Sequence, residues 1–234
     1  MTKKYILSAN EANRLYWLGR YEERVYVALH LLRKCYDKMI DGQQSDYYHF
    51  WEKFNVENIY ASNEEFEYGM LYDENNINSI AFSQRRAMDN AMELRNDITS
   101  ETLSYIEMSI AKIKELKGNK ETNITTLQPI TDWALAFFGS AHQRIENNMV
   151  LSTIFAGRIV EYLDAMIRFD YPIERLRFAL EGLNDYTDKI PGLTDNDALL
   201  NAKALLDNNM PGDAVIDADT KNKLMFNVNR IICA

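Results

Sequence analysis

The sequence predicts an all-α protein, a multi-helix bundle whose two long central helices carry a repeated Gly-Arg-x-x-Glu motif. The 234 residues include only nine Gly and four Pro, so few positions can turn the chain. Hydrophobic residues make up 47% of the chain, enough for a large core. They recur three and four positions apart, as on helix faces, and no segment shows the alternation of a strand.

The first long helix is expected to run from Ser8 to about Ile40. Ser8-Ala9-Asn10-Glu11 matches a capping box, in which Ser8 caps the helix and Glu11 reaches back to its backbone. Asp41-Gly42 is expected to end the helix. Both faces of this helix are apolar, which predicts neighbours all around it. One face carries Leu15, Leu18, Glu22, Val25, Leu29, Leu32, Tyr36 and Met39, and the other Tyr16, Trp17, Val27, Ala28 and Leu31.

The rest of the chain is divided by polar turns and glycines into further helices. Each begins after a polar or Pro-containing turn and continues with apolar residues at helical spacing. The expected helices are two short ones within residues 45–72 joined by a loop over 55–63, a long one from Ser79 to about Lys117, and others over residues 132–141, 145–169, 172–185, 195–208 and 219–232, with a polar linker at 121–128 and a turn at Pro211-Gly212.

A shift of 138 positions superimposes the first helix on the one expected at residues 145–169. The apolar character matches over about four turns, which indicates a duplication or pseudo-two-fold packing of the two helices. The chain is expected to form a single domain over residues 1–234, or two related halves at about 1–120 and 128–234. The shift pairs Tyr16 with Ile154, Trp17 with Phe155, Gly19 with Gly157, Arg20 with Arg158 and Glu23 with Glu161.

These motifs place charged side chains on apolar helix faces. An Arg in such a place keeps its charge and needs acceptor groups, and the Glu one turn on is the nearest. One interpretation is a buried Arg–Glu network that fixes the helix register. The other is a pocket in which the Arg side chains bind a carboxylate or phosphate and Glu orients it or acts as a base. The candidate residues are Arg20, Glu23, Arg24, Arg158 and Glu161.

A third polar cluster lies on the helix expected to begin at Ser79. Arg86 and Asn90 fall on one side of that helix, because positions four apart share a face. Taken alone, they are typical of a solvated helix face. Beside the other two Arg-bearing helices, they would form a third wall of the polar centre.

The sequence gives no basis for assigning a metal, a cofactor or a catalytic residue. It has no Glu-x-x-His pair, no Gly-x-x-x-x-Gly-Lys-Ser/Thr loop, no Gly-x-Gly-x-x-Gly after a strand and no Gly-x-Ser-x-Gly elbow. A metal-dependent bundle stays an alternative only if the three histidines His30, His49 and His142 converge. Whether the protein is an enzyme is left open.

Charge and hydropathy narrow the classes of partner. The net charge is -9, and an acidic surface repels phosphate backbones, so nucleic acid is not expected as a partner. No apolar run approaches the roughly 18 residues of a membrane span, and the first residues show no secretory signal. Cys35 and Cys233 lie in apolar surroundings without metal-ligand spacing and are expected to be buried free thiols. A cytoplasmic location is the expectation.

Three segments resemble the alpha-E domain family, an all-helical bacterial family named for its Glu-Arg motif. Residues 13–24 (NRLYWLGRYEER) resemble its opening block, residues 79–101 its second block, and Gly157-Arg158-x-x-Glu161 its third. Two positions depart from the family pattern: Glu22 replaces an aliphatic residue, and Tyr162 replaces the Arg of the second Glu-Arg dipeptide.

The resemblance implies a role rather than a reaction. The activity of the family is unassigned, and its genes tend to lie beside those of ATP-grasp ligases and transglutaminase-like proteins. By that analogy, the chain is an accessory or substrate-presenting partner in a system that forms amide bonds on peptides, with catalysis supplied by the partner. The alternatives are an enzyme or small-molecule binder that uses the Arg/Glu cluster, and a metal-dependent bundle.

Overall fold

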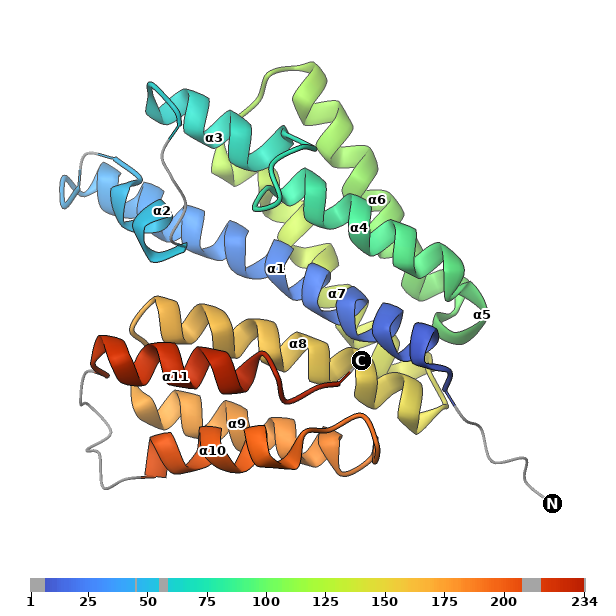
Figure 1. Ribbon diagram of the computed structural model, residues 1–234. Helices are drawn as coiled ribbons and strands as arrows, with labels where there is room; N and C mark the ends of the chain where they lie inside the picture. The colour runs from blue at the N-terminus through green and yellow to red at the C-terminus, as the bar shows by residue number, and fades with distance from the viewer. Residues whose placement is uncertain (1–6, 45, 55–58, 208–215, 234) are drawn as a thin grey trace. The chain divides into compact units, whose positions relative to one another are not determined.

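The computed structural model describes residues 7–44, 46–54, 59–207 and 216–233, and these ranges contain helices and no strand (Figure 1). The protein is all-α, as predicted. None of the described helices is long and apolar enough to cross a membrane. The α-helices are α1 (Ala9–Ile40), α2 (Tyr48–Phe54), α3 (Asn63–Tyr72), α4 (Ile80–Glu93), α5 (Arg95–Ile98), α6 (Ser100–Gly118), α7 (Gln128–Arg144), α8 (Asn148–Arg168), α9 (Ile173–Thr187), α10 (Asn196–Asp207) and α11 (Ala218–Val228), with a short 3-10 turn at Ile124–Leu127.

One compact unit comprises residues 1–20 and 145–234. It contains the start of α1 and helices α8 to α11. Helix α8 packs against α9 and α11, and α10 packs against both α9 and α11. The core of this unit is aliphatic, with side chains such as Leu163, Leu176, Leu183, Leu206 and Val228 almost completely buried.

The second unit comprises residues 21–144. It contains the remainder of α1 and helices α2 to α7, with α6 packed against both α4 and α7 and α3 packed against α4. The aromatic run at residues 47–51 contributes Tyr47 and Phe50 to the core, each 1% exposed. The expectation of one domain, or of two halves at about 1–120 and 128–234, stays a prediction.

The expected helix from Ser79 to about Lys117 is wrong, because three helices, α4, α5 and α6, occupy it. Leu94 ends α4, and Thr99 separates α5 from α6 with φ of +64° and ψ of 150°. A β-branched residue in that conformation cannot continue a helix. The Thr99 hydroxyl instead accepts a hydrogen bond from the Thr102 backbone N–H at 3.4 Å and so caps α6.

The ends of α1 agree with the sequence. Ser8 Oγ accepts a hydrogen bond from the Glu11 backbone N–H at 3.2 Å, and the Ser8 N–H donates to Glu11 Oε2 at 2.8 Å. This confirms the capping box. Gly42, with φ of +68°, follows the last turn as expected. The expected turn at residues 211–212 lies outside the described residues. Cys35 is buried as predicted, whereas Cys233 is exposed.

Candidate functional site

The two helices of the repeated motif, α1 and α8, approach each other closely at Gly19 and Gly157. A Cβ atom on Gly19 would lie 2.0 Å from the carbonyl oxygen of Ile154, and one on Gly157 would lie 2.1 Å from that of Tyr16. Tyr16 and Ile154 are themselves equivalent under the 138-residue shift, so the two contacts are reciprocal. This confirms pseudo-two-fold packing of the two helices, with each glycine removing the side chain that would block it.

Arg20, directly after the first of these glycines, lies in a closed polar cluster. Its side chain is 8% exposed, and that of Glu161 is 9% exposed. Arg20 Nε donates to Glu161 Oε2 at 2.7 Å, while Nη1 donates to Asn229 Oδ1 at 2.9 Å and to the Tyr16 hydroxyl at 3.3 Å. The guanidinium also lies over the ring of Trp17, 5.1 Å from its centre. A buried Arg charge is thus matched by an opposite charge, neutral acceptors and aromatic faces.

The electrostatics agree with this geometry. Burial by itself lowers the pKa of the Arg20 guanidinium, but Glu161, Tyr16 and Asp164 together outweigh this effect and hold the pKa above its ordinary value. Burial also raises the pKa of the Tyr16 hydroxyl, although the neighbouring Arg20 opposes that shift. Arg20 is therefore cationic and Tyr16 neutral at any physiological pH.

The cluster extends toward the C-terminal part of the chain through Asn229. Its amide nitrogen donates to Asp164 Oδ1 at 3.1 Å, and Asp164 also accepts a hydrogen bond from Arg168 Nε at 2.6 Å. The repeated motif in the sequence indicates Arg20 and Glu161 as site residues, but it does not indicate Asn229, Asp164 or Arg168. Asp164 and Arg168 were detectable as an acid–base pair four residues apart on an apolar helix. Asn229 had no signal, because it is one of several polar residues in and directly after α11.

The other residues of the two motifs occupy different environments. Glu23, the counterpart of Glu161 in the first motif, is 2% exposed, so both Glu residues of the repeat are buried. Arg24 is partly buried, with its guanidinium 5.6 Å from the centre of the Tyr21 ring. Arg158, the counterpart of Arg20, is also partly buried and lies 5.8 Å from the centre of the Phe155 ring.

Arg86 and Asn90 lie on the solvent side of α4. The Arg86 side chain is 54% exposed, with its nearest carboxylate that of Asp89 at 3.9 Å. It also stacks on Phe82, 5.1 Å from the ring centre. Asn90 is partly buried. These contacts fit the solvated helix face that the sequence offered as one interpretation of this cluster.

A second buried polar group, which sequence analysis did not single out as a site, lies in residues 21–144. Glu22 on α1 is 1% exposed, and Gln84 on α4 is fully buried. Burial raises the pKa of the Glu22 carboxyl to about 8; the Gln84 amide opposes this shift and the Glu23 carboxylate adds to it. At pH 7 Glu22 is therefore largely a neutral acid. Glu22 Oε1 has no hydrogen-bond partner among the described residues, and Gln84 lies close enough to the carboxyl to lower its pKa through a side-chain hydrogen bond.

The histidines give no support to a metal centre. His30 and His142 are exposed, and the side chain of His49 lies outside the described residues. No group of three or more His, Cys, Asp or Glu side chains that could hold a metal ion occurs in the described part of the chain.

Chemically, the two polar groups differ. Arg20 and Glu161 direct their hydrogen bonds at each other and at neighbouring side chains, an arrangement that fixes helix positions. Glu22 and Gln84 carry unused hydrogen-bonding capacity in the interior, and such groups call for a specific explanation.

Comparison with known proteins identifies the family. A family model described as a predicted alpha-helical domain with a conserved ER motif, Alpha-E, matches residues 7–200 of the 234 residues. No curated protein and no solved structure matches the chain. The match includes both Gly-Arg-x-x-Glu motifs and the Glu23-Arg24 dipeptide. The chain belongs to the Alpha-E family.

Proposed function

We propose that this protein is a non-catalytic, accessory helical component of an amide-bond-forming peptide-modification system. In this proposal it binds an ATP-grasp ligase or a transglutaminase-like protein and presents the substrate to it. The partner supplies the catalytic chemistry, and this chain supplies a rigid surface.

The observation that carries the proposal is the closed state of the Arg20 cluster. If Arg20 were there to bind a substrate carboxylate or phosphate, its donors would face an open cleft. They face Glu161, Asn229 and Tyr16 instead, and the side chain is 8% exposed. The contacts of Arg20 thus support a structural role for the family motif. The interaction with a partner protein is then left to residues on the surface.

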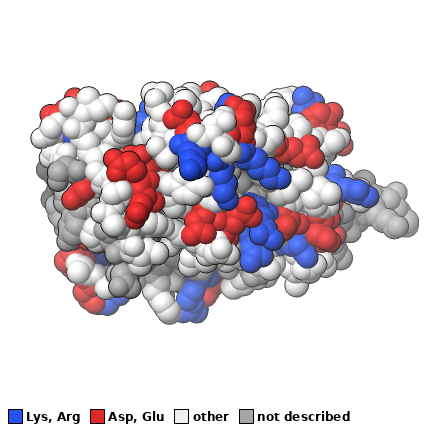
Figure 2. All heavy atoms as spheres, turned by 90° about the horizontal axis from the view of Figure 1, so that it is seen from above, with Lys and Arg blue, Asp and Glu red and all other residues white. Residues whose placement is uncertain are grey.

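The surface properties are compatible with a protein partner. On the face shown in Figure 2, basic and acidic side chains are interspersed, and neither sign forms a continuous field of the kind that tracks a phosphate backbone. Large apolar side chains are also exposed, among them Phe178 on α9 at 78% and Phe226 on α11 at 61%. Aromatic residues are enriched at the centres of protein interfaces.

The test is a reconstitution with an ATP-grasp ligase from the same organism. We expect the chain alone to release no ADP from ATP and to form no amide product. With the ligase, it should form a complex by analytical ultracentrifugation and raise the rate of amide formation. Phe178→Ser removes an exposed aromatic side chain from the surface proposed to bind the ligase. Lys223→Ala, which removes an exposed charge on α11, is its control. Turnover by the chain alone, or a ligase that neither binds nor changes its rate, would reject the proposal.

A further inference from the structure

A cavity of about 860 Å³ opens beside α3 and the turn that follows it. Its volume is in the usual range for small-molecule sites. Three tyrosines contribute to its lining: Tyr60, Tyr68 and Tyr72. Tyr72 is almost completely buried, whereas Tyr68 is 38% exposed and Tyr60 is partly buried. The rings of Tyr60 and Tyr68 are therefore accessible to a ligand.

Three contacts hold the ring of Tyr60 at this cavity. Its hydroxyl accepts a hydrogen bond from Asn76 Nδ2 at 2.9 Å. The ring meets that of Phe66 in a T-shaped arrangement, with 5.6 Å between the ring centres. It also lies against the backbone of α3 at Gly69, where a Cβ atom would come within 2.4 Å of the ring atom Cε1. Gly69 thus provides the space in which this tyrosine lines the cavity.

The charges at the cavity are predominantly negative. Its lining includes four carboxylates and two cations: Glu64, Glu65, Asp73 and Glu74 against Arg85 and Lys117. Both cations already have partners. Arg85 Nη1 lies 3.2 Å from Glu74 Oε2, and Lys117 Nζ donates to the Tyr72 carbonyl oxygen at 3.2 Å. The remaining carboxylates leave an excess of negative charge around the tyrosine rings.

These carboxylates keep acceptor positions for a ligand. Glu65 Oε2 accepts a hydrogen bond from the Ala61 N–H at 3.0 Å, and Asp73 Oδ1 accepts one from the Asn75 N–H at 2.9 Å. An ionised carboxylate offers about four acceptor positions, so each group can accept further hydrogen bonds. Tyrosine rings present a negative face that attracts an ammonium or guanidinium group. The chemistry of the cavity therefore suits an organic cation.

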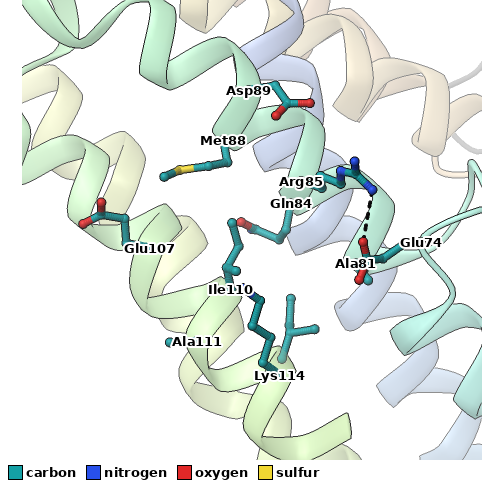
Figure 3. A pocket seen from close by; sticks show the side chains of 11 residues that line it. Glu74, Ala81, Gln84, Arg85, Met88, Asp89, Glu107, Ile110, Ala111 and Lys114 are labelled. Carbon is teal, nitrogen blue, oxygen red and sulfur yellow. Dashed lines mark hydrogen bonds and ion pairs between the residues drawn. The ribbon is translucent and has the colours of Figure 1, made fainter.

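A neighbouring cavity of about 520 Å³, between α4 and α6, shares Glu74 and Arg85 with the first. Figure 3 shows this ion pair beside side chains of α4 and α6 that face each other, among them Met88 and Ile110. Met88 and Ile110 are only partly buried and give this second cavity an accessible apolar lining. A ligand that occupies both cavities is thus cationic in one part and apolar in another.

We propose that the two cavities together bind an extended peptide segment in which a Lys or Arg side chain stands two positions from an aliphatic side chain. The cationic group binds Tyr68 and the carboxylates of Glu64 and Asp73, and the aliphatic side chain contacts Met88 and Ile110. Side chains two positions apart lie on the same face of an extended chain, about 7 Å from each other, and so can enter adjacent cavities.

This proposal names the class of peptide that the chain would present to a ligase, and in that respect it rests on the proposed function. The binding itself is a property of this chain alone, because residues of α3, α4 and α6 provide every group. It can therefore be measured without a ligase.

The test is an NMR titration of the full-length protein with the peptide acetyl-Leu-Ala-Lys-Ala-Leu-amide. Its blocked ends leave the lysine side chain as the only charge, and a leucine stands two positions away on either side. Binding should shift the methyl signal of Met88, which is assigned by its loss in Met88→Leu. Replacing the lysine by glutamine should raise Kd about tenfold. Replacing both leucines by alanine should also raise it about tenfold.

Variants of the protein test the tyrosine-lined cavity. Tyr68→Leu should raise Kd for the lysine peptide about fivefold and leave Kd for the glutamine peptide unchanged. Tyr105→Leu on α6 is the matched control, because Tyr105 is partly buried and lines neither cavity. Glu64→Gln should raise Kd about threefold, with the exposed Glu93→Gln on α4 as its control.

Four results would overturn the proposal. They are no shift of the Met88 signal at about 10 mM peptide, far above the affinity of specific recognition; equal affinity for the lysine and glutamine peptides; equal effects of Tyr68→Leu and Tyr105→Leu; and binding of spermidine as tight as that of the peptide, which would identify a free polyamine as the ligand.

Should Tyr68→Leu fail to fold, the comparisons among peptides on the wild type still decide. Because no ligase is present, failure of peptide binding leaves the proposed partnership standing, and failure of that partnership leaves peptide binding unaffected.

Discussion

Arg20 and Glu161 form an ion pair between residues 141 positions apart, in surroundings that exclude water. Bringing both charges out of water costs several kcal/mol, which the short hydrogen bond and the additional acceptors offset. Removing one partner leaves the other buried without compensation. Loss of one partner therefore destabilises the folded state by more than the pair contributes to stability in net terms.

Arg20→Ala is expected to reduce the free energy of unfolding by about 3–5 kcal/mol. The double variant Arg20→Met/Glu161→Leu removes both charges and should recover most of this loss. Arg86→Ala is the control: the Arg86 side chain is 54% exposed, so its loss should change stability by less than about 0.5 kcal/mol. Urea denaturation measures all three. If Arg20→Ala were as mild as Arg86→Ala, the cluster would not hold the fold.

Glu22 gives the protein a pH dependence that Glu22→Gln should remove. The carboxyl has a pKa of about 8 in the folded state, against an ordinary value of 4.5. Between these values the folded state keeps a proton that the unfolded state releases, so the wild type loses stability as pH rises from about 4.5 to 8. The slope is at most about 1.4 kcal/mol per pH unit.

The measurement is the free energy of unfolding of wild type and Glu22→Gln at pH 5 to 9, with exposed Glu93→Gln as control. The advantage of Glu22→Gln should grow with pH up to about 8 and then level off. A difference that stays constant across this range would mean that Glu22 is already ionised at pH 5.

At the scale of single residues, the sequence indicated the members of the repeated Gly-Arg-x-x-Glu motif and did not indicate the residues outside it. Arg20 and Glu161 stand out because a charged pair in an apolar stripe occurs twice. Gln84 lies in a helix with many polar residues and Asn229 directly after one, and only packing decides which polar residues join a buried cluster. Glu22 was visible as a departure from the family pattern, but nothing in the sequence showed that its carboxyl would be buried beside Gln84.

Among the elements, the approach of α1 and α8 depends on two glycines in the middle of helices. Ordinarily Gly in a helix interior costs about 1 kcal/mol relative to Ala. Here a Cβ atom would lie 2.0–2.1 Å from a backbone carbonyl oxygen of the facing helix. Backbone atoms cannot rotate away, so the helices would have to separate.

Gly157→Ala is therefore expected to lower the free energy of unfolding by about 3 kcal/mol, the upper range for overpacking a well-packed contact. Gly139→Ala on α7 is the matched control, because its Cβ would meet no atom within 4 Å. It should stabilise by up to about 1 kcal/mol through helix propensity. Thermal denaturation of both variants measures the contrast, and equal effects would show that propensity rather than the close approach governs both sites.

The break between α4 and α6 shows why element boundaries were less predictable than element type. The apolar spacing continues from Ile80 to Ile113 with few interruptions, so periodicity indicates one helix. The only local signal is Thr99, and a Thr inside a helical pattern is common. Its positive φ and capping hydrogen bond become visible only in the structure.

At the scale of the whole molecule, the family match ends at residue 200, whereas the compact unit that contains α8 continues to residue 234. Helix α11 packs against α8 and α10. The residues after it contribute two backbone hydrogen bonds, from the Asp195 N–H to the Ile231 carbonyl and from the Cys233 N–H to the Leu193 carbonyl, each of 2.8 Å. The C-terminal part of the chain is thus integral to this unit, and it supplies Asn229 to the Arg20 cluster.

Removing residues 217–234 is expected to abolish the folding of that unit. Leu224, Val228, Ile231 and Ile232 are each at most 7% exposed within its core. At about 1.5–3 kcal/mol for each buried side chain, their loss amounts to roughly 6–12 kcal/mol, comparable to the whole stability of a typical domain. Dispersed amide NMR signals of residues 145–207 should collapse in the truncated chain and persist in the exposed variant Lys223→Ala. Retention of those signals would mean that α8, α9 and α10 form a stable core by themselves and that α11 is only attached to it.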